Sequence, residues 1–160
     1  MIKYAKKDNF YSIFPMGEIP NDWEELTKEE YDKHFEKTLD ELKFEKLSEL
    51  TSTTSKFDNQ LVNNDMVIKS TLGFKVNADL RSQLNIRRLI NIGTEPVSFI
   101  VADNTTVDLS LAQLNILISE CEENMQHLFE LKQSYKKQIT DATTKEELDA
   151  IDLQFPMKEF

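Results

Sequence analysis

Few residues of this chain have the types and the spacing that metal chemistry needs. Glu123 and His127 are four residues apart, which would place two metal ligands on one helix face, but a zinc site needs at least three protein ligands. His34, the other histidine, has no second strong ligand four residues further along. We therefore interpret both histidines as surface residues, and we predict no metal site.

The single cysteine, Cys121, has surroundings that disfavour a reactive thiolate. It lies beside Glu120, Glu122 and Glu123, and carboxylates raise the pKa of a neighbouring thiol rather than lower it. One cysteine also permits no intrachain disulfide. We predict that Cys121 is a buried apolar residue. We interpret the acidic run as a solvated helix face, because it lacks the glycine and the alternating oxygen ligands of a calcium loop.

The pair Asp103-Asn104 is polar enough to suggest catalysis, but a hairpin turn explains it without any chemistry, since Asn tolerates the left-handed backbone conformation. No other titratable groups recur with a spacing that would converge on a pocket. Three glycines in 160 residues also argue against a glycine-rich loop for phosphate. We predict no catalytic residues, no cofactor and no enzymatic activity.

Three arginines, Arg81, Arg87 and Arg88, form the strongest cluster of positive charge. Arg81 and Arg88 are seven residues apart and share one face of a helix. Two interpretations stay open for this basic stripe. It pairs with the acidic long helix of the same chain, which we favour, or Arg81 and Arg88 contact a partner.

The composition excludes several classes of partner. The net charge is −10, from 29 acidic and 19 basic residues, which opposes the counterion displacement that nucleic-acid binding needs and opposes binding to anionic membranes. No apolar run approaches the roughly 20 residues that span a bilayer, and the opening MIKYAKKDNF does not resemble a Sec-type signal. We predict no nucleic-acid binding and no membrane insertion.

The first part of the chain predicts a hairpin and a helical arm. Aromatic residues flank a polar turn within residues 2–14, and residues 15–24 form a loop anchored by Trp23. Thr27-Lys28-Glu29-Glu30 is a capping box, which predicts a helix from about Lys28 into the fifties, weakened at Thr51–Ser55. We place the domain boundary near residue 60, between an N-terminal hairpin and arm (1–60) and a C-terminal α+β domain (61–160).

The second part alternates short hairpins with helices, so the predicted fold class is α+β and helix-rich. Residues 66–76 predict a hairpin, and Asp79 caps a helix to about Asn91 with Leu80, Leu84 and Ile90 inward. A second hairpin follows at 97–109. Capping boxes at Ser110 and Thr144 then start a long amphipathic helix to residue 142 and a short helix that Pro156 ends.

The long helix carries an apolar seam with alternating spacings of three and four residues, which is typical of a heptad pattern with one violation at Lys132. Two alternatives stay open: the seam packs on its own domain, which we favour, or it forms a coiled coil between copies. Phe129 and Leu131 point away from the seam and are expected to cover the hairpins. The candidate interface comprises Leu111, Leu114, Ile118, Cys121, Met125, Leu128, Tyr135 and Ile139.

The order of several short motifs carries a family resemblance. The stretch GFKVNADLRSQLNIRRLI, with Asp79, Arg81 and Asn85, precedes a strand with Phe99, the Asp103-Asn104 turn, LKQSYKKQITDA and TKEELDAI. From about residue 64 to 155 the chain resembles a domain-of-unknown-function family found in phage and prophage tail proteins. The resemblance implies no catalytic residues. It implies structural roles for three positions: a cap, a salt bridge and a helix–hairpin hydrogen bond.

These residues together predict a protein that works by contact with other proteins. The resemblance implies a phage tail-associated structural or tail-fibre assembly protein, with tail-fibre or other tail proteins as partners, located in the virion tail and, during assembly, in the host bacterial cytoplasm. The long helix and the strand edges would cover apolar fibre surface. The alternative is a homo-oligomeric virion component, a fibre or adaptor of tail or head, held by a coiled-coil seam.

Overall fold

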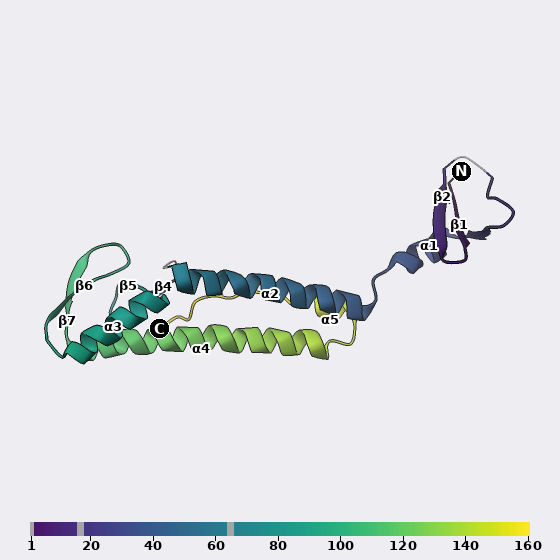
Figure 1. Ribbon diagram of the computed structural model, residues 1–160. Coiled ribbons are helices and arrows are strands. Elements are labelled where there is room, and N and C mark those ends of the chain that lie inside the picture. Colours follow the sequence, from purple (N-terminus) through teal and green to yellow (C-terminus); the bar gives the residue numbers. More distant parts are fainter. Residues whose placement is uncertain (1, 16–17, 64–65) are drawn as a thin grey trace. The chain divides into compact units, whose positions relative to one another are not determined.

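The computed structural model of the chain describes residues 2–15, 18–63 and 66–160, and its fold is α+β as predicted (Figure 1). Contacts divide the chain into two units, Met1–Glu41 and Leu42–Phe160. The predicted boundary near residue 60 therefore differs from the observed division, which falls in the first turn of helix α2. The reason is packing, because Leu50 is buried and Phe57 and Leu61 pack against the core of the second unit.

The first unit contains the predicted hairpin, made of strands β1 (Lys3–Lys7) and β2 (Phe10–Phe14). Asp8 in the turn has a positive φ of 53°. A third strand that the sequence did not predict, β3 (Glu24–Leu26), pairs with the other edge of β1, so the antiparallel order is β2-β1-β3. Residues 16–17 of the predicted loop lie outside the described residues.

The single helix predicted from Lys28 onward is two helices, α1 (Lys28–Phe35) and α2 (Leu39–Asn63). Thr27 caps α1 through the predicted capping box. A second such pair starts α2: the Thr38 N–H donates to Glu41 Oε2 at 2.8 Å, and the Glu41 N–H donates to Thr38 Oγ1 at 3.3 Å. The four-residue pattern that begins at Thr38 therefore indicates the start of a helix in the sequence itself. The Thr51–Ser55 patch stays helical.

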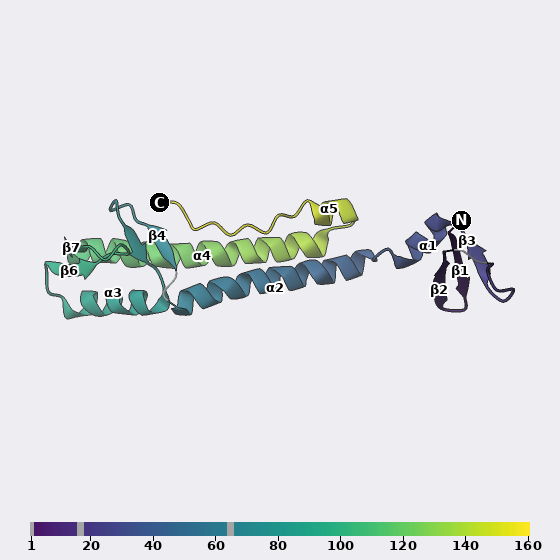
Figure 2. The same cartoon turned by 90° about the horizontal axis from the view of Figure 1, so that it is seen from above.

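The second unit contains the two predicted hairpins and three further helices. The hairpins are β4 (Val67–Lys69) with β5 (Lys75–Asn77), and β6 (Val97–Ile100) with β7 (Thr106–Leu109). The helices are α3 (Leu80–Ile92), α4 (Leu111–Asp141) and α5 (Lys145–Asp149). Figure 2 shows α2 running beside α4 in the opposite direction, with α3 beside the first part of α4.

The core of this unit lies between α4, α3 and the two hairpins. Helix α4 is placed by the Ser110 capping box, and it contributes five of the buried side chains of this core. The side chains of the core are Met66, Ile68, Val76, Ala78, Ile86, Phe99, Val101, Leu109, Leu114, Leu117, Ile118, Cys121 and Leu128. In the described part of the chain, no helix is both long and apolar enough to cross a membrane.

The C-terminal segment after α5 is extended and runs back along α4 (Figure 2). We predicted that Pro156 ends the last helix, but α5 already ends at Asp149. The segment is held by aromatic and polar contacts instead. The Phe155 ring lies 4.6 Å from the Phe57 ring of α2, and the buried Asn124 of α4 accepts the Lys158 N–H at 2.9 Å. Asn124 therefore fixes the end of the chain to α4.

The core assignment predicts different effects for two adjacent residues of α4. Leu117 is fully buried, whereas the side chain of its neighbour Ile116 is 41% exposed. Leu117→Ala should lower the free energy of unfolding by about 2–5 kcal/mol through lost burial and a residual cavity. Ile116→Ala should lower it by less than about 1 kcal/mol. Urea unfolding followed by circular dichroism measures both, and equal midpoints would contradict this packing.

Candidate functional site

Helix α3 is fixed at both ends by its own sequence. Asp79 at the N-cap accepts hydrogen bonds from the Ser82 N–H at 2.9 Å and the Ser82 hydroxyl at 2.8 Å. Gly93 at the C-cap has a left-handed φ of 71°, which glycine adopts without a steric penalty. The capping role that the resemblance implied for Asp79 is therefore confirmed. The helix is set firmly enough to present side chains in a defined direction.

The inward face of α3 differs from the one we predicted. Ile86 is fully buried, and Leu89 and Ile90 pack against the same core. Ile90 was predicted inward and is half-buried, but Leu80 and Leu84 are exposed, with 67% of Leu84 accessible. The helix carries two apolar stripes, and periodicity alone does not say which one meets α4.

The exposed stripe consists of Leu80, Leu84, Arg88 and Ile92. These residues are four positions apart, which places them in one row along the helix. We call this row, together with its two polar neighbours, the α3 outer face. All six of its residues are exposed to solvent. They are Leu80, Arg81, Leu84, Asn85, Arg88 and Ile92.

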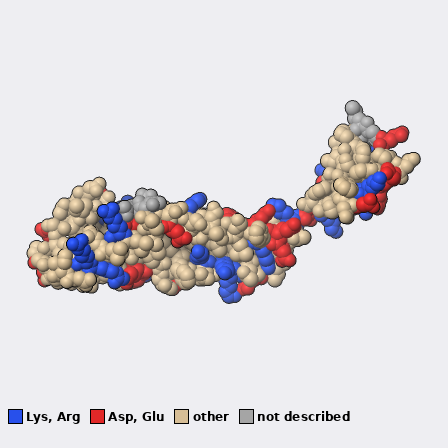
Figure 3. All heavy atoms as spheres, viewed as in Figure 1, with Lys and Arg blue, Asp and Glu red and all other residues tan. Residues whose placement is uncertain are grey.

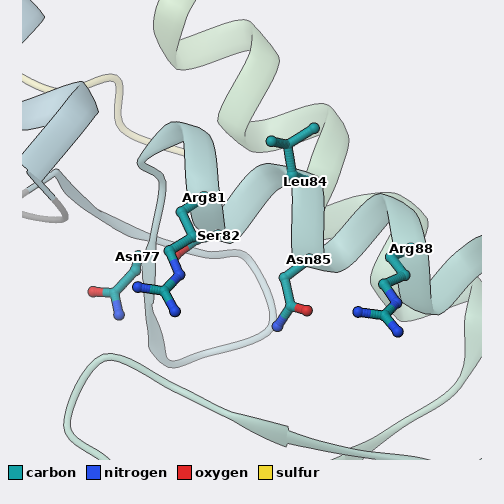
Figure 4. A pocket seen from close by; sticks show the side chains of 6 residues that line it. All are labelled: Asn77, Arg81, Ser82, Leu84, Asn85 and Arg88. Carbon is teal, nitrogen blue, oxygen red and sulfur yellow. The ribbon is translucent and has the colours of Figure 1, made fainter.

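A surface hollow of about 530 Å³ lies against this face (Figure 4). Its lining side chains are Asn77, Arg81, Ser82, Leu84, Asn85 and Arg88. In Figure 4 the two arginine side chains extend to the same side of the helix with Asn85 between them, while Leu84 leaves in another direction. A second hollow of about 210 Å³ shares Asn77, Ser82 and Asn85 and reaches Ile100 on β6. The two hollows share these three lining residues, and cationic and amide groups line them beside α3.

Among the residues that the structure describes, only one of the three arginines forms an ion pair. Arg87 forms an ion pair with Glu122 of α4, so the interpretation that we favoured, pairing of the basic stripe with the long helix, applies to Arg87 and is wrong for Arg81 and Arg88. Arg81 and Arg88 make no ion pair with any residue the structure describes, and basic side chains gather over α3 in Figure 3. The salt bridge implied for Arg81 and the hydrogen bond implied for Asn85 are likewise not found among the described residues.

The predicted seam of α4 packs within its own chain. Leu114, Cys121 and Ile139 are fully buried, and Ile118 and Leu128 are nearly so. The other three seam residues, and the violating lysine, are half-buried: Leu111, Met125, Tyr135 and Lys132. A coiled coil through this seam would therefore require the core to open. Phe129, which we expected to cover the hairpins, is exposed instead.

The polar turn Asp103-Asn104 and His34 make structural contacts. Asp103 accepts hydrogen bonds from the Thr105 hydroxyl at 2.7 Å and the Thr105 N–H at 2.9 Å, which lower the pKa of its carboxyl. Asn104 has the left-handed φ of 66° expected of the turn. His34 stacks on Tyr11 with ring centroids 3.4 Å apart, a contact that the sequence did not indicate. Within residues 2–15, 18–63 and 66–160, no three potential metal ligands cluster.

One known protein family matches most of the second unit. The sequence model of a domain of unknown function (DUF4376) matches residues 57–152, which is more than half of the chain. The chain belongs to the DUF4376 family. The DUF4376 region contains the end of α2, both hairpins of the second unit and α3 to α5, and therefore the whole α3 outer face. Comparisons with curated proteins and with solved structures found no match.

The one cysteine of the DUF4376 region should be unreactive in the folded protein. Burial, and then the charges of Glu120 and Asp79, raise the pKa of Cys121 to about 12. At pH 8 only about one thiol in ten thousand would then be the reactive thiolate. We expect a chromogenic disulfide reagent to label the native chain at least about a thousandfold more slowly than the urea-unfolded chain. Rapid labelling without denaturant would contradict the buried position.

Proposed function

We propose that this protein acts by binding other proteins through the α3 outer face, and that its partner is a phage tail protein such as a tail fibre. The observation that carries the binding role is the exposed row of Leu80, Leu84, Arg88 and Ile92 with Arg81 beside it. The two arginines of this face have no ionic partner among the described residues. The choice of a tail protein rests on the family resemblance of the sequence motifs.

Burial energetics favour a partner for this row. Covering a large aliphatic side chain stabilises a complex by about 1.5–3 kcal/mol relative to leaving it exposed. Leu80, Leu84, Arg88 and Ile92 recur every four residues, which fits the groove-binding mode of recognition, in which one helical face supplies the contacts. Arginine is also enriched among the residues that dominate interface energies. The α3 outer face combines these properties in six residues of one rigid, capped helix.

The arginines of the α3 outer face indicate what kind of partner surface it would bind. The chain as a whole has a net charge of −10, yet the arginines of this face are available for carboxylates. An acidic patch on the partner, beside an apolar groove, would complement both features. Because exposed ion pairs are screened by salt, binding of this kind weakens as the ionic strength rises.

The proposed partner also implies where the protein would work. As a tail-fibre assembly or tail-associated structural protein it would meet its partner in the host bacterial cytoplasm and would accompany it into the virion tail. The rival role, a homo-oligomeric component held by the α4 seam, is less well supported, because Leu114 and Cys121 of that seam are fully buried in the single chain.

The proposal predicts a charge-specific loss of binding. Co-expression with a phage tail-fibre protein should give a stable complex, seen by light scattering after purification. Arg88→Glu should weaken that complex at least about tenfold, since it reverses a charge at the contact. Lys136→Glu makes the same change of charge at an exposed position of α4 and should leave the affinity within about twofold.

Leu84→Asp supplies the matching test of the apolar row, and it should also weaken the complex at least about tenfold. Both α3 variants must keep the helical circular dichroism of the parent chain. If the complex forms with unchanged affinity in both variants, the α3 outer face is not the contact surface. If the parent chain binds no tail protein, the proposed partner class is wrong.

A further inference from the structure

The N-terminal unit has very little core of its own. It spans Met1–Glu41 and lies outside the DUF4376 region. Among its described residues only Ala5 is buried, and α1 contributes no buried side chain. Folded units of about 40 residues or fewer usually need a disulfide, a metal or association with another chain. The only cysteine, Cys121, is in the other unit, so a disulfide within this one is impossible.

The two edges of its sheet differ in a way that points to association. Strand β3 is three residues long and carries Glu24 and Glu25, and such short, charged edges resist pairing with other strands. Strand β2 is five residues long, reads Phe-Tyr-Ser-Ile-Phe and carries no charge. Its outer edge has no strand partner among the described residues, and Phe10 is 71% exposed. The β2 edge is neither short nor charged, so it lacks both features that keep β3 from pairing with other strands.

Both faces of β2 are held in place before any partner arrives. On one face Tyr11 stacks on His34 of α1 and meets the edge of Tyr31. On the other face Phe14 packs edge-on against Trp23, with ring centroids 5.6 Å apart. A strand that is already ordered loses little conformational entropy when it is paired, so more of the contact energy appears as affinity.

We propose that a second copy of this chain pairs with β2, antiparallel, about a two-fold axis at Ser12. The two three-stranded sheets then join as one sheet in the order β3-β1-β2-β2-β1-β3. The strand is nearly symmetric in residue type about Ser12. Phe10 of one copy lies opposite Phe14 of the other, and Tyr11 lies opposite Ile13, which gives the aromatic and aliphatic cross-strand pairs that stabilise sheets.

Charge also favours a second copy over a charged partner. A chain with a net charge of −10 repels its own copy, so a contact between copies needs a neutral surface, and β2 is neutral. The cations on β1 are already paired within the unit. Lys3 lies 3.3 Å from Glu25, Lys6 lies 3.0 Å from Glu24, and Lys7 pairs with Asp22. None of these lysines is left to attract an acidic ligand to this edge.

The register is tested by disulfide trapping. About the proposed axis the two Ser12 Cα atoms are roughly 4.5–5.5 Å apart, within reach of a disulfide. The two copies of Asn9, an exposed turn residue, are then about 20 Å apart, since six residues of strand separate them. Under mild oxidation the Ser12→Cys chain should run as a covalent dimer, and the Asn9→Cys chain should stay monomeric. Equal trapping of both, or of neither, would overturn the register.

The edge itself is tested by a pair of phenylalanine substitutions that does not depend on the cysteines. Sedimentation over a concentration series should show a monomer–dimer equilibrium for the parent chain. Phe10→Lys places a charge on the edge and should weaken the dimer at least about tenfold. Phe44→Lys makes the same change on α2, where Phe44 is 75% exposed, and should leave the dimer unchanged.

A parent chain that stays monomeric at its highest soluble concentration would overturn the proposal, and so would a dimer that Phe10→Lys leaves intact. The outcome is independent of the α3 outer face, because Arg88→Glu alters no residue of β2. That variant should form the parent dimer while it loses the tail protein. Loss of both by the same variant would contradict the separation of the two surfaces.

Discussion

Burial of one side of helix α4 is the constraint on which the second unit depends. Leu114, Leu117 and Cys121 are fully excluded from solvent, and they face side chains from both hairpins and from α3. Neither two-stranded hairpin is expected to be stable alone in water. Each becomes stable by placing one apolar face on α4. The unpaired, buried position of Cys121 follows from this packing rather than from any redox or catalytic role.

The same constraint decides which surface is left for partners. Once Ile86 of α3 turns toward α4, the row that contains Leu84 and Arg88 must face solvent, because the two stripes occupy different sides of one helix. The Arg87–Glu122 ion pair accompanies this orientation, and the other two arginines of the helix form no ion pair within the described part of the chain. The proposed binding surface is therefore a direct consequence of how the core packs.

The two proposed contacts use different physical interactions. The α3 outer face presents side chains, so its selectivity comes from an apolar row and from cations that acidic groups complement. The β2 edge presents backbone N–H and C=O groups, so its selectivity comes from register and from the residues opposite one another. A chain that joins its own copy at β2 would present two α3 outer faces, and a partner with two acidic sites would gain avidity from both.

The sequence alone determined where the helices begin. Thr27, Ser110 and Thr144 start helices because each side-chain oxygen accepts a backbone N–H three residues on, and Gly93 ends α3 for a similarly local reason. The break before α2 was readable as well, from the same pattern at Thr38. These signals join residues only a few positions apart, so they do not depend on how distant segments of the chain pack.

Only the tertiary structure decided which apolar surfaces are covered. The seam through Leu114 could have met another chain, but it is buried within its own chain. The stripe through Leu84 could have met the core, but it is exposed. The association of Phe57 with the second unit, and of Phe155 with Phe57, depends equally on contacts between distant segments. Hydrophobic burial is not directional. A periodic pattern therefore reveals that a face is apolar, and only the competition among all such faces settles what it packs against.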